Sequence, residues 1–165
     1  MLGVDPGLAA MGLAVVGRSG GSPVVLWADV VRTPAGLAEA LRLRRVYGAV
    51  RDAIAEHSPV AVAVERLMWG KNVGSAMSVA RASGVVLLAA ADAGVGVEEY
   101  APLEVKMAVA GSGEAGKDRV RWALRRVHGV VGVPDQPDAA DAVAVALCHQ
   151  HQARMRSVSR EAGRL

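Results

Sequence analysis

Aromatic residues and cysteine are scarce in this chain. Among its 165 residues there is no phenylalanine, and there are only three tryptophans and two tyrosines. Valine, alanine and leucine must therefore fill the core. The single cysteine, Cys148, excludes an internal disulfide and suits a reducing compartment such as the cytoplasm. We expect Cys148 to be a small buried thiol.

A clean membrane-spanning run is also missing. The most apolar stretch, residues 73–91, carries Arg81 near its centre, where an arginine costs roughly 2.5–3.5 kcal/mol on insertion into a bilayer. At the N-terminus, Asp5-Pro-Gly7 interrupts the apolar segment that a signal peptide would need. We therefore expect a cytoplasmic protein with no contact to a membrane.

Charge of one sign is only slightly in excess, with a net charge of +3. Four arginines and one glutamate in residues 154–165 account for that excess, so residues 1–153 are balanced. The length predicts one domain over 1–153, followed by a basic C-terminal tail over 154–165 that we expect to be disordered. If four acids neutralise metal ions, the remaining body is basic and fits a phosphate-rich partner. Charge alone favours the alternative, a soluble enzyme with a solvated basic tail.

Hydrophobic periodicity predicts an α/β fold with a five-stranded mixed sheet flanked by helices. Strands are predicted at 2–5, 12–16, 24–31, 60–64 and 97–101, with a hairpin turn at 17–23. Helices are predicted at 35–57, 72–93, 102–109, 117–128 and 137–153. Three meandering strands are thus followed by two strands that alternate with helices. In such sheets, sites form at the carboxyl ends of strands.

Four carboxylates stand where a metal site would need them. Asp5 and Glu65 each end a predicted strand, and neighbouring parallel strands would bring them to within roughly 5–10 Å. Asp138 and Asp141 share one face at the start of the last helix, since residues three apart are neighbours. Like charges repel, so such a group is costly unless a cation holds it, and hard oxygen ligands favour magnesium or manganese. Taken alone, the helix pair fits equally well a role in complementing the helix start.

Two lysines flank the glycine-rich loop at 110–116. Lys106 precedes this loop and Lys117 follows it, so either could bind phosphates or steady a charged transition state. For a single lysine, a solvated surface position is the alternative. His149 and His151 lie too far along the helix from Asp141 to share a metal with it, and we expect both to be solvated at the helix end.

The segment after Glu65 combines polar and large apolar residues. Lys71 and Asn72 are polar candidates for DNA contact, whereas Met68 and Trp69 are unusually large and apolar for a loop. An exposed side chain of this kind could wedge against unstacked bases. The alternative, packing of Trp69 beneath the loop as part of a small core, is equally compatible with the sequence.

These residues occur in a recurring order along almost the whole chain. The matching pieces are Gly3-Val-Asp-Pro-Gly7, Val64-Glu-Arg-Leu-Met-Trp-Gly-Lys-Asn72, Ala82-Ser-Gly-Val85, Glu99-Tyr-Ala101, Val105-Lys106, Gly111-Ser-Gly113, Lys117 and Asp138-Ala-Ala-Asp-Ala142. In this order and spacing they resemble the RuvC family of Holliday-junction resolvases. The resemblance implies a ribonuclease-H-like fold, a homodimer, and a divalent-metal endonuclease that cuts two opposed strands of a four-way DNA junction.

The resemblance also implies roles for individual residues. It makes Asp5, Glu65, Asp138 and Asp141 the ligands of two Mg²⁺ or Mn²⁺ ions per active site. Lys117 would offset charge on the phosphate, and Lys106 would contact DNA. The RuvA and RuvB branch-migration proteins are the implied partners.

One departure from the family pattern affects DNA contact. Members usually carry phenylalanine three residues after the glutamate, where this chain has Met68, followed by Trp69. Base wedging would then pass to one of these two residues.

Three rival functions are compatible with parts of the pattern. One is a related ribonuclease-H-like nuclease that acts on RNA or on another branched DNA. A second is an actin-like ATP-binding protein, although 165 residues leave no room for the duplicated domain of that fold. A third is a structure-specific DNA-binding module without catalysis, which the complete acidic quartet disfavours.

Overall fold

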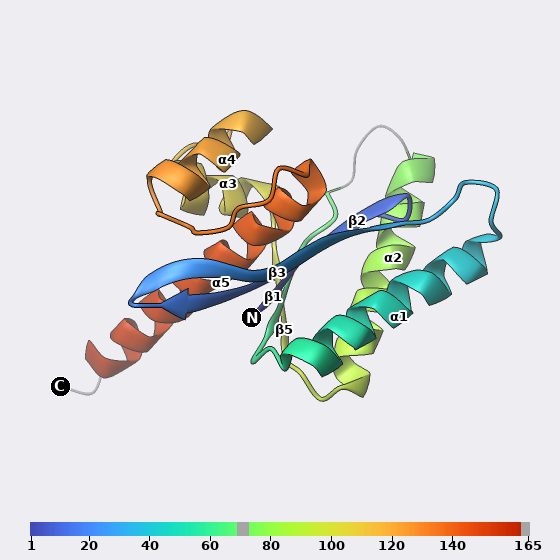
Figure 1. Cartoon of the computed structure of the whole chain (residues 1–165), viewed down its shortest axis with the longest axis horizontal. Coiled ribbons are helices and arrows are strands. Elements are labelled where there is room, and N and C mark those ends of the chain that lie inside the picture. Colours follow the sequence, from blue (N-terminus) through green and yellow to red (C-terminus); the bar gives the residue numbers. More distant parts are fainter. Residues whose placement is uncertain (69–72, 163–165) are drawn as a thin grey trace.

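The computed structural model describes residues 1–68 and 73–162. Its five strands form one mixed sheet, as predicted, in the order β3-β2-β1-β4-β5 (Figure 1). The strands are β1 (Leu2–Asp5), β2 (Ala10–Ser19), β3 (Ser22–Arg32), β4 (Val62–Glu65) and β5 (Val97–Tyr100). β1 and β2 are antiparallel, as are β2 and β3, whereas β4 runs parallel to both β1 and β5. β1, β3, β4 and β5 therefore all end at the same edge of the sheet.

Helices cover both faces of this sheet. They are α1 (Glu39–His57), α2 (Val73–Asp92), α3 (Pro102–Ala110), α4 (Lys117–Arg126) and α5 (Pro137–Ala162). α1 and α2 pack on one face, where the buried side chains of Leu2, Val4 and Leu13 meet them. α3, α4 and α5 lie on the opposite face and enclose a second core with Ala14, Val16 and other small residues (Figure 1). Side chains alternate between the two faces along each strand, so the residue pattern determines which core each one enters.

Two glycines bring the start of α5 unusually close to the sheet. A Cβ atom on Gly3 of β1 would overlap the carbonyl oxygen of Ala142, and one on Gly12 of β2 would overlap that of Asp138. The absence of a side chain at these positions lets the helix backbone approach the strand backbones directly. This approach places the first turns of α5 over the end of β1.

The sheet is longer than predicted on the side of the β2–β3 hairpin. The predicted turn at 17–23 contracts to Gly20-Gly21, whose φ angles of 55° and 88° suit a tight hairpin turn that glycine adopts without strain. The flanking polar residues pair as strand because backbone hydrogen bonding continues beyond the apolar pattern. α1 begins at Glu39 rather than at residue 35.

The last helix is also longer than predicted. α5 continues to Ala162 instead of ending near Ala153, so most of the tail that was expected to be disordered is helical. Residues 138–162 contain neither glycine nor proline, and alanine, arginine, glutamine and glutamate all favour helix. The polarity of this segment therefore did not indicate a break in the helix.

α2 packs against both α1 and the sheet. Arg81 donates a hydrogen bond to the Glu39 carboxylate of α1 across 2.6 Å, and Ala82 and Val86 are fully buried against the sheet. Within the described residues, no helix is both long enough and apolar enough to span a membrane.

Candidate active site

Asp5 and Glu65 lie side by side at the edge of the sheet where β1 and β4 end. Val4 pairs with Val64 in parallel register, so the next residue of each strand is one of the two acids. Both carboxylates line a pocket of about 250 Å³. The predicted convergence of these two strand ends is therefore present in the structure.

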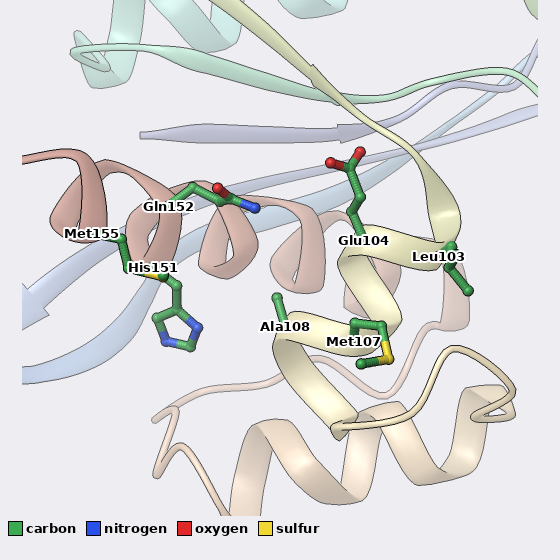
Figure 2. A pocket seen from close by; sticks show the side chains of 7 residues that line it. All are labelled: Leu103, Glu104, Met107, Ala108, His151, Gln152 and Met155. Carbon is green, nitrogen blue, oxygen red and sulfur yellow. The ribbon is translucent and has the colours of Figure 1, made fainter. Parts of the chain in front are cut away.

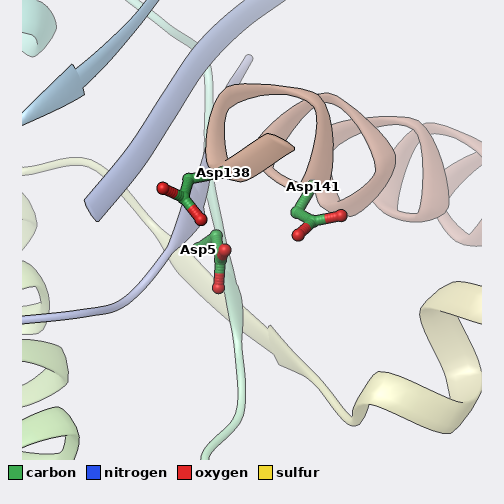
Figure 3. A group of neighbouring side chains, drawn as sticks. All are labelled: Asp5, Asp138 and Asp141. Carbon is green, nitrogen blue, oxygen red and sulfur yellow. The ribbon is translucent and has the colours of Figure 1, made fainter. Parts of the chain in front are cut away.

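The start of α5 adds two further carboxylates. One carboxylate oxygen each from Asp5, Asp138 and Asp141 lies within 4.8 Å of the others, and the three side chains lie close together where the start of α5 meets the end of β1 (Figure 3). Asp138 occupies the first turn, where the helix macrodipole favours an anion. The helix pair thus lies close to the strand-end acid Asp5.

Glu65 stands slightly apart from this group of three. Among the described residues, it is not part of the set of mutually close ligand atoms, yet it lines the same pocket as Asp5 and Asp141. Burial raises its pKa first, and the charge of Asp141 raises it further. The four carboxylates therefore form one electrostatic cluster with Glu65 at its margin.

The crowding of these acids shifts the pKa of Asp5. Burial raises the pKa of Asp5 to about 7, and the neighbouring charges of Glu65, Asp141 and Asp138 act in the same direction. A raised pKa means that the ionised form of this carboxyl group is destabilised unless a cation lies nearby. Hard carboxylate oxygens that converge from two strands and a helix fit Mg²⁺ or Mn²⁺ by their chemistry.

Lysines are the only counterions present among the described residues of this pocket. The ammonium of Lys117 is 2.6 Å from an Asp141 oxygen, and that hydrogen bond raises the pKa of Lys117. Lys106 lines the same pocket and lowers the pKa of Glu65 in opposition to its burial. Both lysines are placed by α3 and α4, which are joined by the glycine-rich loop.

The loop after β4 is only partly described. Met68 lies three residues beyond Glu65 and its side chain is 61% exposed. Trp69, Lys71 and Asn72, which were candidates for DNA contact, lie outside the described residues. The nearby Arg66 donates a hydrogen bond from its backbone N–H to the carbonyl of Tyr100, which ties the loop to β5.

Sequence reasoning missed two kinds of supporting residue. Gly3 and Gly12 allow α5 to reach Asp5, and a glycine inside a strand is the signal that could have indicated a close backbone approach.

His149 was expected to be solvated, but this is wrong: it is buried, and its Nδ1 is 2.8 Å from the hydroxyl oxygen of Tyr100. His149 packs against Tyr100 of β5 at this point, so a position near the helix end is not a surface position. Cys148 is buried as expected, and burial raises its pKa to about 11.

A larger groove lies elsewhere on the protein. It measures about 460 Å³ and runs between α3 and the distal part of α5 (Figure 2). Its lining consists of Leu103, Glu104, Met107, Ala108, His151, Gln152 and Met155. With a single carboxylate in its lining, this groove lacks the ligand set of the smaller pocket.

Comparison with known proteins identifies relatives over nearly the whole chain. A relative from Chloroflexus aggregans, named crossover junction endodeoxyribonuclease RuvC, is 45% identical over 152 residues. The match covers 92% of this chain and 93% of the relative. A relative of the same name from Moorella thermoacetica is 44% identical over 165 residues, with 99% of each chain covered. The sequences therefore match along their full lengths.

Solved structures agree with this likeness. RuvC of T. thermophilus in complex with a Holliday junction substrate superposes with a TM-score of 0.85 at 37% identity, covering 93% of this chain and 94% of that one. The yeast mitochondrial Holliday junction resolvase Ydc2, at 10% identity and a TM-score of 0.65, shares the ribonuclease-H-like fold. The family model for crossover junction endodeoxyribonuclease RuvC matches residues 1–149, and this chain belongs to that family.

Proposed function

We propose that this protein resolves four-way DNA junctions by paired, symmetric nicks through two-metal phosphodiester hydrolysis, in recombination and repair. As a member of the RuvC family, it is a hydrolytic endodeoxyribonuclease. The observation that carries the proposal is that carboxylates from β1, β4 and α5 (Asp5, Glu65 and Asp141) line one pocket together with two lysines, while Asp138 lies close to Asp5 and Asp141.

Each residue of the pocket has a distinct part in this proposal. Asp5, Glu65, Asp138 and Asp141 would hold two Mg²⁺ or Mn²⁺ ions, which would supply an activated water and charge stabilisation for the departing oxygen. Hydrolysis would join the water oxygen to phosphorus and break the bond from phosphorus to the 3′ oxygen, which takes up a proton from water, leaving a 5′ phosphate and a 3′ hydroxyl. Lys117, once it leaves Asp141, would neutralise charge on the phosphate oxygens. Lys106 would bind the DNA backbone beside the same pocket.

Contact with unstacked bases is assigned to the loop after β4. Met68 is exposed close to Glu65, a position from which an apolar side chain can wedge between bases. Trp69, Lys71 and Asn72 follow it in the chain and complete the proposed contact. The T. thermophilus relative was solved with junction DNA, which supports junction binding by this chain.

A homodimer would supply the two sites that two opposed cuts require. Support comes from α2, where the exposed residues fall along one helix face and include large apolar side chains. Among the residues of α2 whose burial is described, they are Gly74, Met77, Arg81, Gly84, Leu88, Ala91 and Asp92. RuvA and RuvB would be the partners, and the cytoplasm would be the location, both by family relationship.

Mapping the cut sites on a synthetic four-way junction tests this function. With Mg²⁺ or Mn²⁺ we expect two symmetric nicks in opposed strands, and little cutting of a plain duplex or an RNA–DNA hybrid. Preferential cutting of the hybrid would instead favour a ribonuclease, and binding without cutting would favour a non-catalytic module.

Substitution of a proposed ligand separates catalysis from binding. Glu65→Gln keeps the side-chain volume but removes the charge, so we expect cutting to fall by at least about 10²-fold, consistent with loss of a charge-stabilising ligand. Junction affinity, measured by fluorescence anisotropy, should be retained. If Glu65→Gln cuts at the wild-type rate, the proposed role of this carboxylate is wrong.

A further inference from the structure

Among the residues that the structure describes, the side of the active site formed by β2 and β3 carries one exposed cation, Arg32. Residues 6–12, which follow Asp5 and lead into β2, contain no charged side chain. Arg32 ends β3 at the same edge of the sheet and is exposed. Within the described residues it forms neither an ion pair nor a side-chain hydrogen bond, in contrast to Arg42, Arg66 and Arg81.

Strand register places Arg32 on the same face of the sheet as the carboxylates. Asp5 pairs with Gly12, Gly12 pairs with Val30, and Ala10 pairs with Arg32. Paired residues of antiparallel strands point to the same face, and Gly12 faces the backbone of α5 at Asp138. Arg32, two residues beyond Val30, therefore points to the α5 side, as Asp5 does.

The same register gives the distance between the two residues. Two strand spacings separate β1 from β3, and Arg32 lies two residues further along its strand than the partner of Gly12. With strands about 4.8 Å apart and a rise of about 3.4 Å per residue, the Cα atoms of Asp5 and Arg32 are about 12 Å apart. This corresponds to roughly three to four nucleotides of a duplex strand, at about 3.4 Å of axial rise for each.

The backbone around Arg32 is held in place. The next residue, Thr33, is buried and its hydroxyl donates a hydrogen bond to the carbonyl oxygen of Leu8. The backbone N–H of Thr33 donates to the carbonyl oxygen of Ala9 across 3.1 Å, and Arg42 of α1 donates to the Thr33 hydroxyl oxygen across 2.8 Å. The end of β3 is thus fastened to the loop that follows Asp5, which fixes the origin of the Arg32 side chain relative to the site.

We propose that Arg32 binds the phosphate backbone of substrate DNA on the β3 side of the active site, about three to four nucleotides from the phosphate that is cut. This inference rests on the proposed function and extends it to a surface opposite the β4 loop and the two lysines. The DNA that enters here approaches four carboxylates, so an unpaired guanidinium beside the path offsets part of that repulsion. A guanidinium also matches phosphate oxygens with two parallel donors.

Junction binding without cutting measures this contact. In the presence of EDTA, Arg32→Ala should weaken binding of a fluorescent four-way junction by roughly threefold to tenfold, regardless of sequence. The slope of log affinity against log salt concentration should become shallower by about 0.9 for each lost phosphate contact. Arg32→Lys, which keeps the charge, should restore most of the affinity and the salt dependence.

Arg18→Ala is the matched control. Arg18 is an exposed arginine near the other end of the same hairpin, about 26 Å from the level of Ala10 for eight residues of strand. Its loss removes the same charge and should leave the salt slope unchanged. Hydroxyl-radical footprinting should show that Arg32→Ala, unlike Arg18→Ala, loses protection three to four nucleotides from the cut.

The outcomes separate this inference from the proposed function. Wild-type protein that binds a junction no better than it binds duplex would contradict the proposed function. If the wild type binds the junction specifically, and Arg32→Ala has the same affinity, salt slope and footprint as the wild type, only the proposed role of Arg32 is wrong. A melting temperature close to that of the wild type shows that Arg32→Ala is folded, as expected for an exposed side chain.

Discussion

Asp5 shows most clearly how the active site strains the protein that contains it. Its carboxyl group is partly buried beside Glu65, Asp138 and Asp141, and its pKa is raised to about 7. Each of these acids costs folding free energy when ionised close to the others. Lys117 offsets part of that repulsion through its contact with Asp141.

A pH dependence of stability follows for the metal-free protein. Since the pKa of Asp5 is about 7 in the folded state and 3.8 as the reference value, the folded protein holds an extra proton between these values. Asp5 therefore makes its full contribution to the free energy of unfolding below about pH 4. This contribution is lost as the pH rises towards 7, and the loss is roughly 4 kcal/mol at most. Urea unfolding in EDTA at pH 5 and pH 8 measures it, with Asp5→Asn as control; equal pH dependence in both proteins would contradict the assignment.

Asp5→Asn should also exchange function for stability. The amide removes one of four crowded charges, so at pH 8 in EDTA we expect the free energy of unfolding to rise by about 1–3 kcal/mol. Cleavage of a junction should be lost, and the stabilisation that Mn²⁺ provides to the wild type should decrease. Thermal melting with and without Mn²⁺ tests both effects. If Asp5→Asn is less stable than the wild type in EDTA, the carboxylates do not repel one another in the folded protein.

At the scale of elements, the contact of α5 with β1 and β2 assembles the site. Gly3 and Gly12 remove the side chains that would hold the helix away from the strands. Asp138 and Asp141 consequently reach Asp5, although they lie more than 130 residues away along the chain. The distance between helix and sheet therefore determines the geometry of the carboxylate cluster.

Gly12→Ala tests this dependence. Its new Cβ would overlap the carbonyl oxygen of Asp138, and the first turn of α5 must shift to accommodate it. We expect about 1–3 kcal/mol of destabilisation from overpacking and a loss of cleavage of about 10²-fold, because small misplacements of reacting groups have large effects on rate. Gly48→Ala, in α1 with open space around the glycine, should be neutral or stabilising and fully active. Equal activity of the two variants would contradict the role of close helix approach.

At the scale of the whole molecule, two faces remain open for association. The α5 face carries the pocket and Arg32, and the outer side of α2 exposes Met77 and Leu88. We propose that the first binds DNA and that the second binds another copy of the chain. Their separation on opposite sides of the sheet lets both be used together.

Leu88→Glu should dissociate the proposed dimer. A charge placed in an apolar interface between two copies is costly to bury, so light scattering at micromolar concentration should report a monomer. The two nicks in a junction should then become independent events in a plasmid-based cruciform assay. Leu26→Glu, at a comparably exposed leucine on β3, should remain dimeric. A wild-type protein that is itself monomeric would contradict the proposed dimer.

The sequence alone was enough to predict most of the fold. Alternating and continuous apolar runs identified all five strands, and the carboxylates at strand ends indicated the edge where a site would form. Element ends were less certain because hydrogen bonding continues past the apolar pattern, as in the β2–β3 hairpin and in the last turns of α5. Burial of His149 against Tyr100 of β5 could not be predicted either, since the sequence around a histidine near a helix end does not reveal its distant neighbour.

What the sequence determined by itself was local: the strand and helix order, and the kind of atoms that each element presents. Only the tertiary structure decided which of these atoms meet. The approach of α5 over Gly3 and Gly12 made separate acids into one cluster, and strand register placed Arg32 on their side of the sheet. Such relations depend on packing between segments distant in the chain, and periodicity within a segment does not encode them.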